Sequence, residues 1–403
     1  MSGLLANTHY NTLLALSRNS EAMMKLQEQA STGSRINRCS DDPSSAYEIL
    51  GLNTQKRDYE NYIDNLSQIS DSLEMSLTIL EGEGSGSGIV QSTSDIRENL
   101  TQILSGTYSQ ESRDRLADQI NDVLERVLSM ANTKHSQSYL FGGSDTSEKP
   151  YVAEKENGVI TKVEYKGSQN ARQVKVAPGV ESSGFIPGTD IFGSENRSEP
   201  EMLTEQTGVS LGSGTSSVNG FTWINVDYND SSGNYELYLD DASQKVEIDP
   251  AEDNSNVALT NSEGRVLYVN AENISSTGKE LVNTSGTNDI FDTLITIRDI
   301  LKNEQGLDLD EVAKLAEKTI DVLDEVNNKI LNTTTSIGMK VGFLEDLKNN
   351  LEDMQFNVKE QTTNLQEADI AEIAVDLSQR ETLYQMSLSI ASRLMSTSLL
   401  DYI

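Results

Sequence analysis

The sequence has very little of the chemistry that most enzymes, metal sites and disulfide-stabilised folds require. Its 403 residues contain one cysteine, Cys39, and two histidines, His9 and His135. A single cysteine excludes an intrachain disulfide and a cysteine-rich metal site, and two distant histidines exclude the HExxH zinc motif. The only Gly-Lys pair, Gly278-Lys279, lacks the upstream glycine of a phosphate-binding loop. We therefore expect no catalytic residue, no bound metal and no cofactor.

Basic patches and long apolar runs are also scarce. The chain carries 31 Lys and Arg against 64 Asp and Glu, a formal net charge of −33. Scattered basic residues cannot neutralise a row of phosphates, so neither nucleic acid nor an anionic membrane is an expected partner. No stretch approaches about 18 apolar residues, and the first thirty residues lack a basic start followed by an apolar core. We therefore expect no membrane insertion and no Sec-type signal.

What the chain does have is a regular apolar repeat near its C-terminus. Residues of this repeat recur every seven positions, a spacing that keeps one apolar stripe of a helix facing a partner helix. They are Leu323, Ile330, Ile337, Leu344, Leu351, Val358 and Leu365. No proline interrupts the sequence from Asp310 to Leu365. One helix of roughly 80 Å is therefore predicted, at 1.5 Å per residue.

An N-terminal segment repeats the same spacing and can supply the partner helix. Its apolar residues are Tyr59, Leu66, Leu73 and Leu80. We predict an intrachain coiled coil between the two segments. Asp42-Pro43 predicts the start of this helix, because Asp is a favourable N-cap and Pro a favourable first helical residue. Four glycines between Glu81 and Gly88 predict a break after it.

The middle of the chain, residues 150–284, has a different pattern. Short alternating runs such as Val159–Tyr165 and Phe221–Tyr228 predict strands separated by turn residues. Trp223 is predicted to be an anchor in a core or at a domain face. The Gly- and Ser-rich segment Ser210–Ser217 is predicted to be a flexible loop. The fold class is therefore mainly α with a β-rich insert, an α+β fold.

Several short motifs then resemble one family, the bacterial flagellins. Ser31–Asn37 (STGSRIN) and Asp41–Pro43 (DDP) resemble the N-terminal flagellin signature. The C-terminal motifs are Ala368–Ala371 (ADIA), Tyr384–Ser387 (YQMS) and Ser398–Ile403 (SLLDYI). Together with Tyr139–Gly143 (YLFGG), these C-terminal motifs are most similar to the family members that form the junction between hook and filament.

The resemblance implies long antiparallel terminal helices that form a helical-bundle rod, with an outward β domain. We expect an inner, assembly-dependent layer of paired helices (1–40 and 368–403), a rod domain (41–149 and 285–367) and a β-rich outer domain (150–284). Apolar stripes on the terminal helices are expected to face each other and, exposed in a monomer, to form the assembly interface. They comprise Leu13, Leu16, Met23, Ala30, Ile370, Ile373, Leu377, Tyr384, Leu388, Ala391 and Met395.

The function implied is that of a structural, non-enzymatic subunit of the extracellular bacterial flagellum at the hook–filament junction. Such a subunit is exported unfolded through the type III apparatus and assembles with copies of itself. Its other expected partners are the first hook-associated protein, flagellin and an export chaperone. Flagellin itself is the alternative reading, and a coiled-coil adhesin whose β insert binds a sugar or receptor is a further one. A zinc protease hosted in the β-rich outer domain would be another alternative, but it would require the HExxH motif that the sequence lacks.

Overall fold

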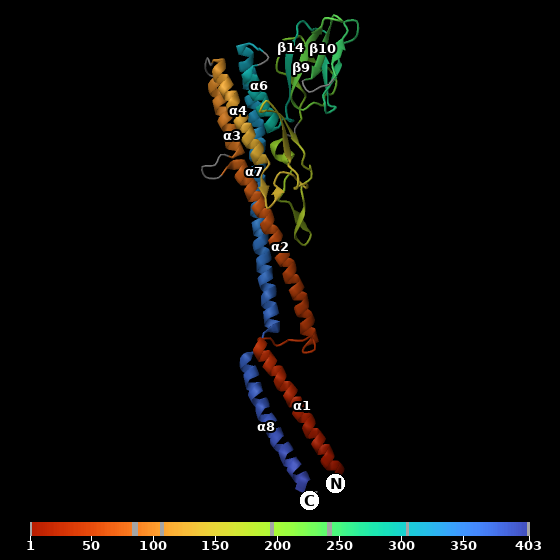
Figure 1. Ribbon diagram of the computed structural model, residues 1–403, viewed down its shortest axis with the longest axis vertical. Helices are drawn as coiled ribbons and strands as arrows, with labels where there is room; N and C mark the ends of the chain where they lie inside the picture. The colour runs from red at the N-terminus through yellow and green to blue at the C-terminus, as the bar shows by residue number, and fades with distance from the viewer. Residues whose placement is uncertain are drawn as a thin grey trace. The chain divides into compact units, whose positions relative to one another are not determined.

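The computed structural model describes residues 2–82, 88–104, 109–193, 197–239, 244–303 and 306–400, and side chains within residues 10–393. The chain forms two compact units. One unit combines Met1–Asp64 with Leu347–Ile403, and the other comprises Asn65–Asp346. Helices at both ends of the sequence flank a β-rich middle, which confirms the predicted α+β class (Figure 1). The unit boundaries divide two long helices, and the expected three-part domain division stays a prediction.

The first unit is built from helices contributed by both ends of the chain. Helix α1 (Ser2–Thr32) and helix α8 (Ile370–Leu400) lie side by side, with the two termini at the same end of the pair (Figure 1). The unit also contains the start of α2 (Pro43–Glu81) and the end of α7 (Leu309–Gln366). Helix α7 has 58 residues, or about 87 Å at 1.5 Å per residue. The prediction of one uninterrupted helix is confirmed.

The helical part of the second unit adds three shorter helices to the remainders of α2 and α7. They are α3 (Ile89–Leu104), α4 (Gln110–Ala131) and α6 (Ile290–Lys302). The predicted break is confirmed, because α2 ends at Glu81 and α3 begins at Ile89; residues 83–87 lie outside the described residues. Gly82 has a φ of +89°, the left-handed conformation in which glycine commonly ends a helix.

The β-rich part contains two larger sheets and several hairpins. A five-stranded antiparallel sheet has the order β11-β10-β9-β14-β7, and a three-stranded antiparallel sheet has the order β12-β13-β8. Their strands are β7 (Glu201–Met202), β8 (Ser210–Leu211), β9 (Gly220–Asn229), β10 (Asn234–Leu239), β11 (Val246–Ile248), β12 (Val257–Thr260), β13 (Val266–Asn270) and β14 (Gly278–Thr284). The hairpins and the short helix beside them are β1 (Lys134–His135) with β2 (Ser138–Tyr139), β3 (Tyr151–Glu156) with β4 (Val159–Tyr165), β5 (Val174–Ala177) with β6 (Val180–Ser182), and α5 (Gly188–Phe192).

The two larger sheets share one hydrophobic core. Ile224 and Leu237 from the five-stranded sheet pack in one cluster with Leu259 and Leu267 from the three-stranded sheet, and all four are at most 1% exposed. Alternating residues of β9, β10 and β13 enter this cluster, so one face of each of these strands is directed to it. The strands predicted at Val159–Tyr165 and Phe221–Tyr228 are confirmed as β4 and β9.

The β-rich part is fastened to the helices by aromatic and charged side chains. Trp223 of β9 packs against a cluster that includes Ile300 of α6 and Leu315 of α7, so its predicted role as a domain-face anchor is confirmed. Arg298 of α6 is 2% exposed. Its guanidinium donates hydrogen bonds to the Ile160 carbonyl oxygen and to the Asn121 side chain, which connects α6 to β4 and α4.

The prediction of a flexible loop at Ser210–Ser217 is wrong for its first part. Ser210 and Leu211 form strand β8 and pair with Asn270 and Val269 of β13. Arg197 holds the part that follows, because its guanidinium donates to the carbonyl oxygens of Ser216 and Val218, each at 2.8 Å. The glycines of this segment allow close packing, because a Cβ atom at Gly212 or Gly214 would collide with Asn256 or Tyr268.

Candidate functional site

The flagellin-like motif Ser31–Asn37 lies where α1 ends and turns toward α2. Gly33 adopts a φ of +67°, and its N–H donates to the Gln29 carbonyl oxygen at 2.9 Å. A left-handed glycine after the last helical residue is a common helix terminator. The motif therefore has a local structural reason, which is to end the N-terminal helix at a fixed point.

This turn is bonded to the matching turn between α7 and α8. The N–H of Arg35 donates to the Gln366 carbonyl oxygen at 2.7 Å, and the N–H of Ala368 donates to the Gly33 carbonyl oxygen at 3.1 Å. Ser34 pairs with Glu367 in an antiparallel bridge and is 8% exposed. We call these two turns, residues 33–42 and 367–369, the joint. Because backbone bonds cross it, both chain ends leave the joint in a defined register.

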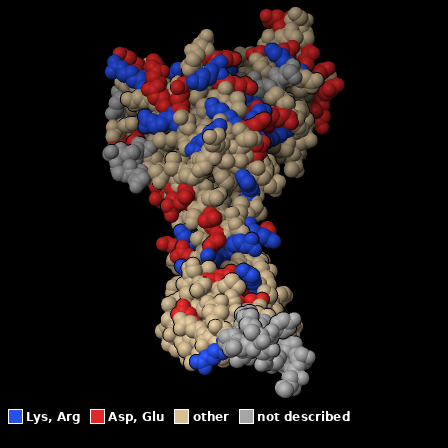
Figure 2. Space-filling model, turned by 60° about the horizontal axis from the view of Figure 1, so that its bottom comes forward, with Lys and Arg blue, Asp and Glu red and all other residues tan. Residues whose placement is uncertain are grey.

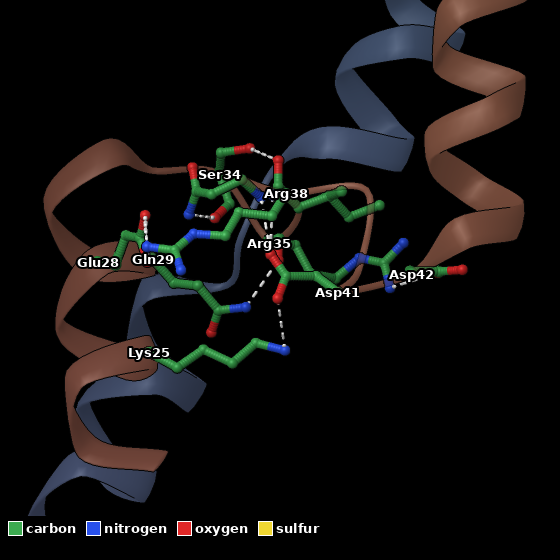
Figure 3. A network of polar contacts seen from close by, with 10 residues as sticks. Lys25, Glu28, Gln29, Ser34, Arg35, Arg38, Asp41 and Asp42 are labelled. Carbon is green, nitrogen blue, oxygen red and sulfur yellow. Dashed lines mark hydrogen bonds and ion pairs between the residues drawn. The ribbon is translucent and has the colours of Figure 1, made fainter. Parts of the chain in front are cut away.

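Charged side chains of α1 form ion pairs with residues of the joint (Figure 3). Lys25 lies 3.0 Å from Asp41, and Arg38 lies 3.3 Å from Glu28. Asp41 also accepts the backbone N–H groups of Asn37 and Arg38 at 3.2 and 2.9 Å. The hydrogen bond from Lys25, followed by that from the Arg38 backbone, holds the pKa of the Asp41 carboxyl below its ordinary value. These contacts orient the end of α1 relative to the loop that follows it.

Asp42 caps the next helix, as the sequence predicted. Its carboxylate accepts the Ser45 backbone N–H at 3.2 Å and the Ser45 hydroxyl at 2.6 Å. The Ser45 contacts hold the pKa of Asp42 below its ordinary value. Arg35 adds a second contact, with its guanidinium 3.4 Å from the Asp42 carboxylate and 3.2 Å from the Leu365 carbonyl oxygen. The interpretation of Asp42 as a cap is confirmed, and Asp41 serves the loop instead.

The predicted stripes of the terminal helices have mixed surroundings. Five of these side chains are half-buried in the pair, namely Leu16, Met23, Leu377, Tyr384 and Ala391. Ile373 is buried, whereas Leu13, Ala30, Ile370 and Leu388 are exposed. The side chain of Met395 lies outside the described residues. The structure thus places about half of the predicted set between α1 and α8, and the assembly role of the set stays a prediction.

The terminal helices carry a second apolar surface that sequence reasoning missed. On α8, Val375, Leu383, Met386 and Ile390 are between 47% and 59% exposed. At about 100° per residue they lie on the face opposite Leu377, Tyr384 and Ala391. Their spacing was readable in the sequence, but the predicted stripe of α8 comprised residues of the other face. On α1, Tyr10 and Met24 are likewise exposed, at 66% and 57%.

Charged residues are also present on this surface, because Glu372 and Arg393 share the α8 face of Val375 and Met386 at 100° per residue. In Figure 2 the terminal helices, at the bottom of the view, show mainly uncharged residues, whereas acidic and basic side chains are mixed over the upper part. Exposed helix faces that are mainly apolar are typical of interfaces that are completed by another molecule.

The predicted coiled-coil residues are largely buried. Leu66, Leu73 and Leu80 of α2 have no exposed surface. On α7, Leu323, Ile330, Ile337, Leu344, Leu351 and Val358 are at most 6% exposed. Tyr59 and Leu365, at the ends of the two repeats, are half-buried. The burial agrees with the seven-residue spacing, while the coiled-coil pairing stays a prediction.

Other kinds of site receive no support from the part of the chain that the structure describes. Among those residues, no three His, Cys, Asp or Glu side chains group together. No helix within the described ranges combines the length and apolarity that crossing a bilayer demands. Cys39 is exposed and free.

Comparison with known proteins identifies the class to which this architecture belongs. The model of the bacterial flagellin N-terminal helical region matches residues 6–146, and that of the C-terminal helical region matches residues 320–403. Together the two matches cover more than half of the chain, and they include the joint, most of α1 and all of α8. The chain belongs to the bacterial flagellin family.

Individual proteins similar to this chain include two curated sequences and a crystal structure. The chain is 28% identical over 139 residues to flagellar hook-associated protein 3 of Escherichia coli K12, which covers 34% of this chain and 42% of that protein. It is 27% identical over 135 residues to flagellar hook-associated protein 3 of Salmonella typhimurium, covering 33% and 41%. The chain thus matches less than half the length of these curated relatives. The crystal structure of flagellar hook-associated protein 3 from Legionella pneumophila has a TM-score of 0.52 at 19% identity, covering 79% of this chain and 98% of that one. This likeness shows a shared fold.

Proposed function

We propose that this chain is a structural subunit of the bacterial flagellum that forms the junction between hook and filament. The observation that carries the proposal is that one chain holds both flagellin-type terminal regions, joined in register and with apolar faces left uncovered. The similarity to hook-associated protein 3 of two bacteria supports the junction over the filament itself. Flagellin remains the second candidate, because both matched family models describe flagellin helical regions.

Assembly would be driven by the outer apolar faces of α1 and α8. Burying apolar surface yields about 25 cal/mol per Å² removed from water, so several partly exposed side chains on each subunit stabilise a contact together. Copies of the same chain, the first hook-associated protein and flagellin are the proposed partners. An export chaperone would cover these faces before assembly, since exposed apolar helices otherwise associate non-specifically.

The proposed location is the extracellular flagellum, reached by export of the unfolded chain. A single cysteine leaves no intrachain disulfide to be formed or broken along that route. The proposed subunit performs no catalysis, and its role is mechanical connection.

Deletion of the gene tests the proposal, with motility, flagellin blots of cells and medium, and electron microscopy of flagella as readouts. Bare hooks with flagellin released into the medium support the junction role. Bare hooks with the major flagellin absent from cells and medium would instead make this chain the filament subunit. Normal flagella would contradict both roles.

Complementation with matched variants then tests the assembly surface. Val375→Ser and Met386→Ser alter exposed residues of α8, which are 57% and 59% exposed, and should fail to restore filaments. Val152→Ser alters a residue of β3 that is 42% exposed and should restore them. Equal complementation by all three variants would argue against α8 as the assembly surface.

A further inference from the structure

Oxygen-bearing side chains without partners gather where β14 runs into α6. Asn288 is completely buried, yet neither its Oδ1 nor its Nδ2 has a hydrogen-bond partner. The buried hydroxyl of Thr284 has none either. Because buried polar atoms are nearly always partnered, these groups require a water molecule or an ion to satisfy them.

Two carboxyl groups lie against each other at the same place. Asp289 is the N-cap of α6 and accepts the backbone N–H of Asp292 at 2.8 Å. The side chains of Asp289 and Asp292 are also hydrogen-bonded to each other. Although Asp292 reaches solvent, its pKa lies well above the ordinary value, because surrounding protein atoms desolvate the carboxyl and because Asp289 adds its charge and hydrogen bond. The N-terminus of a helix stabilises one nearby carboxylate, but two carboxyl groups are present here.

The basic residue that acts on Asp292, Lys162, is itself paired with a carboxylate. Lys162 lowers the pKa of Asp292, but its ammonium lies 3.4 Å from the carboxylate of Glu263, which acts on Asp292 in the opposite direction. The local balance is therefore negative.

Gly220 of β9 leaves space beside these groups. Its φ is +59°. A Cβ atom at this position would lie 3.6 Å from Asn288 Oδ1 and 4.0 Å from Asp292 Oδ2, which are the nearest atoms outside the adjoining residues. Thr284 is the partner of Gly220 in the β9–β14 ladder, and cross-strand partners direct their side chains to the same face of a sheet. Amide, hydroxyl and carboxylate oxygens thus surround one small space.

We propose that this space binds a calcium ion through the side-chain oxygens of Asn288, Asp289 and Asp292, with Thr284 and water completing the coordination. Calcium takes six to eight oxygen ligands of mixed type in flexible geometry, whereas zinc prefers the His and Cys ligands that this place lacks. The ion would join the start of α6 to the β9–β14 end of the sheet and satisfy the unpartnered Asn288 amide oxygen. This inference does not depend on the proposed flagellar role.

Thermal unfolding and calorimetric titration of the full chain with calcium chloride, against an EGTA-treated control, test the proposal. A calcium site of low affinity binds in roughly the 0.1–1 mM range. At about 10 mM calcium the folded-to-unfolded ratio should then rise roughly 10- to 100-fold. Asp292→Asn should abolish this rise and be at least as stable as the wild type in EGTA, because the amide relieves the crowded carboxyl pair.

Asp230→Asn is the matched control, since it removes one carboxylate from the β9–β10 turn and should keep the full calcium response. The proposal is overturned if calcium leaves the wild type unchanged or if Asp292→Asn retains the response. It is overturned equally if Asp230→Asn loses as much of the response, because the ion would then be bound by the general negative charge.

Discussion

Leu344 and Phe343 are neighbours in α7 with opposite surroundings, and they give the sharpest test of the helix register. Leu344 has no exposed surface, whereas Phe343 is 56% exposed. Replacing Leu344 by alanine removes a buried isobutyl group and leaves a cavity, which should cost about 3–5 kcal/mol. Replacing Phe343 by alanine removes little buried area and introduces the best helix former, so its effect should stay within about 0.5 kcal/mol.

Urea unfolding followed by far-UV circular dichroism measures both variants. With a slope of about 3 kcal/mol per M, the loss at Leu344 lowers the midpoint by roughly 1 M or more, and the Phe343 variant stays near the wild type. A hydrophobicity scale alone would rank the phenylalanine as the costlier loss. Equal costs, or a larger cost at Phe343, would refute the seven-residue register on which the interpretation of α7 depends.

Three further changes follow from single contacts. Lowering the pH should release the Asp42 cap, because the pKa of Asp42 is lowered in the folded chain. The contribution of the cap to stability is complete above pH 3.8 and is lost as the pH falls through the lowered pKa. Faster amide exchange in the first turn of α2 would detect the loss. Arg298→Met should cost about 2–4 kcal/mol in urea unfolding, since the Ile160 carbonyl oxygen loses a charged donor, and an unchanged midpoint would contradict this. Trp223→Ala should cost about 2 kcal/mol, because its half-buried ring packs on α6 and α7, and unchanged thermal stability would argue against the anchor.

The long helices could be predicted because their signals are local. The seven-residue repeat, the Asp42-Pro43 start and the glycine-rich break each depend on residues close in sequence, and each has its counterpart in α2, α3 or α7. A helix needs no distant partner to define its hydrogen bonds. The sequence was therefore sufficient for these elements.

The sheet arrangement could not be predicted in the same way. Strand β14 pairs with β9 and β7, which lie far away in sequence, and nothing in the alternating pattern of one strand specifies its neighbours. Ser210–Leu211 shows the same limit, because a glycine- and serine-rich segment became a strand only through its partner β13. The unpartnered amide of Asn288 is likewise visible only when β14, α6 and Gly220 are placed together.

For the terminal helix α8, the sequence analysis predicted only one of the two apolar faces that the structure shows. The predicted stripe on α8 includes Leu377 and Tyr384, which are half-buried, while Val375, Leu383 and Met386 on the opposite face are exposed. One partner helix can cover only one stripe of α8, because a helix presents a single face to each neighbour. A helix that is apolar on two opposite faces therefore needs a second partner before its apolar surface is removed from water. The joint fixes where α1 ends and where α8 begins, so the uncovered faces of both helices extend from it in one register. Repeated assembly of identical subunits requires such a fixed arrangement.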